Sequence, residues 1–166
     1  QSKTIAINTD FSLNGTTNSA EKALELQNGT LVLNDAGIDI ELNSGGGNFT
    51  IPAEAGLSIQ AGTARVSSTG IGVGNGIRLD GKIALSGGDL ILNGGSGADN
   101  FLEYGTGGSS EIEISSGNLV VGSQLRRNLL SDDGVIAYNQ TGGTAVFGVN
   151  STPDDSRGVF EIINTG

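Results

Sequence analysis

The chain has 166 residues, of which 29 are glycine and none is cysteine, histidine or tryptophan, and its formal net charge is −10. The missing cysteine and histidine exclude a disulfide framework, a thiolate nucleophile and a Ser-His-Asp triad. The acidic balance argues against nucleic acid as a partner, and no apolar run reaches the ~20 residues that membrane insertion requires.

The first alternating segment covers residues 3–13, in which apolar residues occupy every other position around Ile5 and Ile7. Such alternation predicts a half-buried strand. We expect residues 1–19 to form an N-terminal strand, a cap or a strand-exchange segment. The residues predicted to exchange with a neighbouring molecule are Thr4, Ile5, Ala6 and Ile7.

A ten-residue pattern then recurs through residues 20–125: apolar residues at positions 1, 3, 8 and 10 with a glycine at position 6. Its copies start about 26 to 33 residues apart, a spacing typical of stacked repeats. The four copies are Leu24, Leu26, Gly29, Leu31, Leu33; Leu57, Ile59, Gly62, Ala64, Val66; Ile83, Leu85, Gly88, Leu90, Leu92; and Ile112, Ile114, Gly117, Leu119, Val121. Each copy predicts two short strands joined at a glycine corner.

Further alternating pairs lie between the copies, at Ile38 to Leu42, Phe49 to Ile51, Ile71 to Val73 and Ile77 to Leu79. The sequence therefore predicts an all-β fold, a parallel β-solenoid or β-helix of short strands with Gly and Asn corners, whose repeat core covers residues 20–125. A β-sandwich or jelly roll is the alternative, because its strands and turns have similar lengths. The recurring corner favours the solenoid, in which coils stack in register.

The pattern weakens after Val121, and we expect residues 126–166 to form irregular C-terminal coils or a cap. Residues 125–130 are predicted to form a helical turn or a loop. Strands are predicted at 135–138, 144–149 and 159–163, where apolar residues alternate again.

One segment, Gly94 to Leu102, resembles a single nonapeptide of the calcium-binding RTX repeats. The resemblance implies that Asp99 is a Ca²⁺ ligand, and Ca²⁺ is the one cofactor that we consider. A glycine-rich corner with an exposed aspartate is the alternative, because no tandem copy flanks the segment.

Five asparagines precede a Thr by two positions and are glycosylation candidates: Asn14, Asn28, Asn48, Asn139 and Asn150. Glycans on these side chains would indicate a secreted protein. Alternatively, Asn marks the turns and Thr opens the following strands, which produces the same spacing without a glycan. A chain that begins at Gln1 fits either the removal of a secretory leader or excision from a longer protein.

Catalytic residues are not predicted. The adjacent pairs Asp132-Asp133 and Asp154-Asp155 would point to opposite faces of a strand, whereas a glycosidase requires two carboxyl groups that face each other. Basic and aromatic residues, which would line a cleft for a charged sugar, are scarce.

The Leu-x-Leu-x-x-Gly-x-Leu-x-Leu corners and the Gly-, Asn- and Thr-rich composition resemble those of β-strand-repeat proteins of microbial surfaces, such as adhesins, autotransporter-like passengers and secreted filament subunits. The resemblance implies a non-enzymatic, extracellular structural or adhesive role. We expect self-association into a fibre or homo-oligomer through strand edges, with a surface glycan as a further partner. A viral tail-fibre or spike segment and a carbohydrate-active β-helix enzyme are the alternatives.

Overall fold

The computed structural model describes residues 3–8, 24–42, 48–66, 76–93, 100–105, 109–131, 133–149 and 158–162. Every regular element in these ranges is a β-strand. The strands are β1 (Thr4–Ile7), β2 (Gly29–Glu41), β3 (Phe49–Ile51), β4 (Ala55–Arg65), β5 (Ile77–Leu79), β6 (Lys82–Leu92), β7 (Leu102–Tyr104), β8 (Ser109–Val121), β9 (Leu125–Arg127), β10 (Val135–Gln140) and β11 (Thr144–Phe147). Among the residues so described there is no helix that could cross a membrane.

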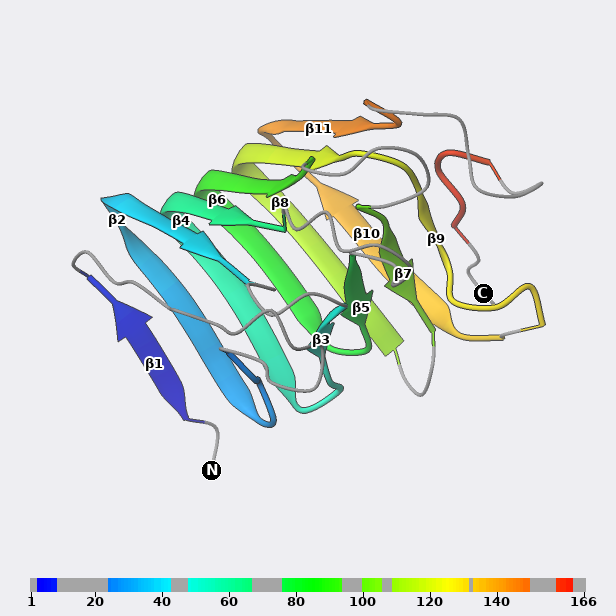
Figure 1. The fold of residues 1–166 in the computed structure, drawn as a ribbon, viewed down its shortest axis with the longest axis horizontal. Coiled ribbons are helices and arrows are strands. Elements are labelled where there is room, and N and C mark those ends of the chain that lie inside the picture. Colours follow the sequence, from blue (N-terminus) through cyan, green and yellow to red (C-terminus); the bar gives the residue numbers. More distant parts are fainter. Residues whose placement is uncertain are drawn as a thin grey trace.

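The strands form two sheets, and each described pairing is parallel. One sheet has the order β1-β2-β4-β6-β8-β10, with β11 also on β8, and the other has the order β3-β5-β7-β9 (Figure 1). From β2 to β10 the chain alternates between the two sheets and returns to each sheet one strand further along. The protein is a β-solenoid, as predicted, and it has about four turns. The β-sandwich alternative is wrong, because its strands would pair mainly antiparallel.

Aliphatic side chains stack in register from coil to coil and form the core. The pairs Leu31–Leu57 and Leu57–Ile83 are each 26 positions apart in sequence, and Ile83 in turn pairs with Ile112. All four side chains are buried. Burying a side chain of this size contributes about 1.5–3 kcal/mol, so these columns supply the apolar burial that the scarce aromatics do not.

The bends within β4, β6 and β8, and the bend between β10 and β11, depend on a column of glycines. Gly62, Gly88, Gly117 and Gly143 have φ values of 79°, 65°, 83° and 67°, in the left-handed region that disfavours other residues. A Cβ atom at Gly88 would collide with the carbonyl oxygen of Gly62, and one at Gly117 would collide with that of Gly88. Glycine is therefore required both by the backbone angle and by the coil that lies next to it.

One predicted corner is wrong. Gly29 pairs with Ala55 at the start of β2, and Leu31 and Leu33 pair with Leu57 and Ile59. The true second half of this coil begins after a break in register near Asn34 and contains Ile38 and Ile40. The pattern matched Gly29 because Leu24 and Leu26, which precede β2, alternate in sequence as strand residues do, although this glycine lies at the start of β2 and before the bend.

Three further local predictions need correction or fall outside the described residues. Residues 125–127 form strand β9 rather than a helical turn or loop. The predicted strand at 159–163 is reduced to an isolated bridge between Phe160 and Leu125, because its described residues do not continue the ladder. Ile71 and Val73 lie outside the described residues.

Candidate functional site

The first described strand of the solenoid, β1, lies at one end of its sheet and has one edge that no described strand pairs with. β1 pairs on one side with β2, where Ile5 lies beside Leu31 and Ile7 beside Leu33. Within the described residues no strand pairs with its other side. Ile5 occupies a core position of the ladder and yet is 66% exposed, since no further coil covers it there. Among the described strands, β1 is therefore an open sheet edge with an exposed apolar side chain.

The backbone direction at this edge follows from one hydrogen bond. The Thr30 N–H donates to the Lys3 carbonyl oxygen at 2.8 Å, so Lys3 turns its polar groups toward β2. Successive residues of a strand in a parallel ladder direct their N–H and C=O groups to alternate sides. Thr4 and Ala6 consequently present their backbone groups to the open edge.

The opposite end of the solenoid carries β10 and β11, which both pair with β8 (Figure 1). Here the Thr141 N–H donates to the Ile114 carbonyl oxygen at 2.8 Å, which directs Thr141 toward β8. By the same alternation, Tyr138 and Gln140 present their N–H and C=O groups to the outer edge of β10. No described strand pairs with that edge.

The side chains at this second end are aromatic and polar rather than aliphatic. Tyr138 pairs with Ile112 and so continues the aliphatic column, and its hydroxyl donates to Gln140 Oε1 at 2.7 Å. Phe160 contacts the rings of Tyr138 and Phe147 edge-on, with centroid distances of 5.4 Å and 4.9 Å. Partial burial raises the pKa of Tyr138. Phe160 remains 45% exposed, so apolar surface is accessible here as well.

Another core column ends in an ion pair. Tyr104 pairs with Arg127 in the ladder, and its hydroxyl donates to the Glu161 carbonyl oxygen at 2.9 Å. Arg127 Nη2 lies 2.9 Å from Glu161 Oε1, and the Arg127 N–H donates to the other carboxylate oxygen at 3.0 Å. These contacts attach the segment around Glu161 to the last coil.

The charged groups on the outer face of β5, β7 and β9 are paired with one another. Glu103 lies between Arg78, at 3.4 Å, and Arg126, at 2.9 Å. Arg126 also donates to Gln124 Oε1 at 2.8 Å and lies 4.5 Å from the centre of the Phe101 ring. Because Glu103 and Arg126 are both buried, this arrangement is suited to holding coils together rather than to binding a substrate.

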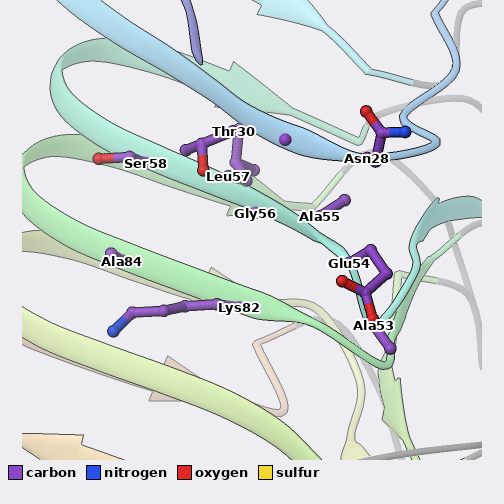
Figure 2. A pocket seen from close by; sticks show the side chains of 11 residues that line it. Asn28, Thr30, Ala53, Glu54, Ala55, Gly56, Leu57, Ser58, Lys82 and Ala84 are labelled. Carbon is purple, nitrogen blue, oxygen red and sulfur yellow. The ribbon is translucent and has the colours of Figure 1, made fainter. Parts of the chain in front are cut away.

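A shallow groove of about 680 Å³ lies on the outer face of β2, β4 and β6, where Gly56 and Ala84 leave the sheet thinly covered (Figure 2). Glu54 and Lys82 are its charged lining residues. The Lys82 ammonium points away from Glu54 in Figure 2 and instead lies 2.7 Å from Glu113 and 3.3 Å from Glu111. The lining therefore supplies no facing acid–base pair.

Of the predicted site residues that the structure describes, Thr4 to Ile7 lie together in β1, whereas Asn28, Asn48 and Asn139 lie in separate segments. Asp99, Asn14 and Asn150 lie outside the described residues. Asn28 is exposed beside the groove, and Asn139 is exposed on β10. The side-chain oxygen of Asn48 accepts a hydrogen bond from the Gly76 N–H at 3.1 Å, which is a structural role between coils.

Within the described part of the chain, no group of three or more Asp and Glu residues is arranged to hold a metal ion. Sequence reasoning also missed Tyr138, Gln140 and Phe160, the side chains at the second end. Stepping 26 positions along the sequence from Ile112 leads to Tyr138, so the repeat period could have identified it.

No protein-family model matches this chain, and neither a curated protein nor a solved structure matches it. The geometry of the solenoid and of its two ends is thus the basis for a functional proposal.

Proposed function

We propose that the protein is a non-enzymatic, extracellular structural subunit that self-associates into a fibre through its strand edges. One observation carries the proposal: β1 and β10 are members of the same parallel sheet, and each has an edge that no described strand covers. Unpaired edges of this kind accept strands from other chains.

The two edges differ, so a contact between them is heterologous. A heterologous contact that does not close into a ring adds copies without limit and forms a filament. The exposed apolar side chains Ile5 and Phe160, one at each end, add hydrophobic burial to such a contact.

Strand exchange is a variant of the same assembly. Thr4 to Ile7 pair with β2 of their own chain. In an exchanged filament the same four residues would leave that position and pair with β2 of a neighbour. Both variants use β1, and both predict that assembly depends on it.

A structural, non-enzymatic role is supported by the ion pairs that the charged side chains form with one another. Glu103 is held between Arg78 and Arg126, and Lys82 is held by Glu111 and Glu113. The exposed sequon residues Asn28 and Asn139 would be accessible to glycans, in keeping with an extracellular location.

Electron microscopy and light scattering of the purified chain test this proposal. We expect concentration-dependent filaments, and we expect deletion of residues 1–13 to abolish them while the β-sheet circular dichroism is retained. A protein that stays monomeric at ~100 µM would contradict the proposal. A stable threefold mass would instead favour the tail-fibre alternative, and release of unsaturated sugars from uronic polymers would favour the enzyme.

A further inference from the structure

We propose a specific register for the contact between copies: Tyr138 of one copy lies beside Ile5 of the next, in a parallel pairing of β10 with β1. This inference rests on the proposed function and identifies the partner of the β1 edge as a second copy of this chain. The new pairing repeats the one that already joins neighbouring coils within a molecule.

The ladders of the sheet continue across this contact. Within one molecule, an inward column starts at Ile5 and ends at Tyr138, passing through Leu31, Leu57, Ile83 and Ile112. An outward column starts at Ala6 and ends at Asn139. Placing the next copy as one more coil puts Ile5 beside Tyr138 and Ala6 beside Asn139, so that inward residues meet inward residues.

The backbone groups of the two edges are complementary in this register. The backbone N–H and C=O groups of Tyr138 point to the open edge of β10. Those of its partner Ile5 point to β2, so the backbone groups of Thr4 and Ala6 point to the open edge of β1. In a parallel ladder one facing residue bonds to the two neighbours of its register partner. The Tyr138 N–H would therefore donate to the Thr4 carbonyl oxygen, and the Ala6 N–H would donate to the Tyr138 carbonyl oxygen.

A slip of one residue breaks both matches at once. It would turn Ile5 from the core side of the sheet to the outer side, because side chains alternate with a period of two. It would also set the facing backbone groups of β10 against residues of β1 that face β2. A slip of two residues preserves the alternation and has to be separated by experiment.

A second copy suits this edge because of its backbone pattern. β10 presents outward the same alternation of N–H and C=O groups that β8 presents to β10, so β1 of a second copy can pair with β10 as β10 pairs with β8. The contact would cover Ile5, now 66% exposed, with the half-buried ring of Tyr138. An aliphatic side chain against an aromatic one is a favourable cross-strand pair.

Engineered disulfides test the register directly, because the chain contains no cysteine. Register partners in neighbouring strands lie ~4.8 Å apart, which is within the Cα separation that a disulfide spans. The double variant Ala6→Cys with Asn139→Cys should give a ladder of covalent oligomers on a non-reducing gel after mild oxidation, and the ladder should disappear with reductant.

Matched variants distinguish the alternatives. Ala6→Cys alone should give no covalent dimer. A strong dimer would contradict the pairing of β10 with β1 and indicate a two-fold pairing of β1 with β1. Ala6→Cys with Ala137→Cys should cross-link at least 10-fold less, and the reverse order would show a two-residue slip. Filaments that no pair cross-links would overturn the inference, whereas a cysteine-free chain that forms no filaments would overturn the proposed function itself.

A proline variant tests the proposed backbone hydrogen bond independently of the cross-links. Ala6→Pro removes an N–H that points to the open edge, and it leaves the hydrogen bonds between β1 and β2 in place. Proline is tolerated at such positions of edge strands. We expect it to raise the concentration needed for assembly at least 10-fold. Ala6→Val retains the N–H and should assemble as the unmodified chain does. Equal assembly by both variants, with unchanged circular dichroism, would contradict the proposed bond.

Discussion

Each glycine of the corner column is held by the backbone of the adjacent coil. We expect Gly88→Ala to lower the free energy of unfolding by about 2 kcal/mol or more, because alanine disfavours a positive φ and its Cβ would meet the Gly62 carbonyl oxygen. Chemical denaturation measures the change. Gly56→Ala is the control: its nearest new contact is the Thr30 Oγ1 atom at 3.3 Å, in a side chain that can move. Equal losses for both variants would contradict the corner role.

The two arginines that contact Glu103 should differ in their contributions. Arg126 is buried and 2.9 Å from Glu103, so Arg126→Ala leaves a buried carboxylate less compensated and should cost about 3 kcal/mol. Arg78 is exposed, and its ion pair is screened by water, so Arg78→Ala should cost less than about 1 kcal/mol. Urea unfolding of the two variants compares them, and a larger loss for Arg78→Ala would contradict the assignment.

At the scale of elements, the ion pairs between β6 and β8 predict a dependence on pH. Hydrogen bonding to Lys82 lowers the pKa of Glu113 below its ordinary 4.5, and that bond raises the pKa of Lys82 above 10.5. The stabilisation from this pair is therefore fully present between these two values. It is lost as the pH falls through the lowered pKa of Glu113 or rises through the raised pKa of Lys82.

Lys82→Met should flatten the fall in melting temperature on acidification, because Glu113 then returns toward its ordinary pKa. Thermal melts at a series of pH values below 5 measure the slope for each variant. Lys3→Met removes the same charge elsewhere and should leave the slope unchanged. A slope that is identical in the Lys82 variant and the unmodified chain would show that the ion pair does not couple β6 to β8.

Most elements could be predicted because local alternation and the repeat agree, as in β4 and β6, where the glycine corner is flanked by aliphatic pairs. The β2 coil was misassigned because its bend near Asn34 has no glycine of the same kind, and Gly29 supplied a false match. The 26-position step from Leu31 to Leu57 would have given the correct register of β2 against β4. The end contacts of Phe160 could not be predicted, since they join segments without a shared period.

For the whole molecule, the 26-residue step between β4 and β6 predicts that one coil can be removed. Deleting residues 57–82 joins Gly56 to Ile83. Ile83 is the register partner of Leu57, the residue that normally follows Gly56, so the aliphatic columns stay aligned. We expect a folded, shorter solenoid with a smaller free energy of unfolding, because stability in stacked repeats is a sum over coils and their contacts. Circular dichroism and urea unfolding test this.

Deleting residues 57–69 is the control for that experiment. It removes half a coil and would place β4 residues beside positions of the wrong face, so we expect it to unfold or aggregate. A folded protein after this shorter deletion would show that register between coils does not determine stability.

The parallel pairing of β2, β4, β6 and β8 also determines how the molecule would respond to tension. The hydrogen bonds between coils run along the stacking direction, so a force applied at the two ends loads them in line and unzips one coil at a time. Each released coil of about 26 residues supplies about 85–95 Å of extended chain. A filament of such units would lengthen many-fold before breaking, and it would recover by rewinding each coil onto the exposed face of its neighbour.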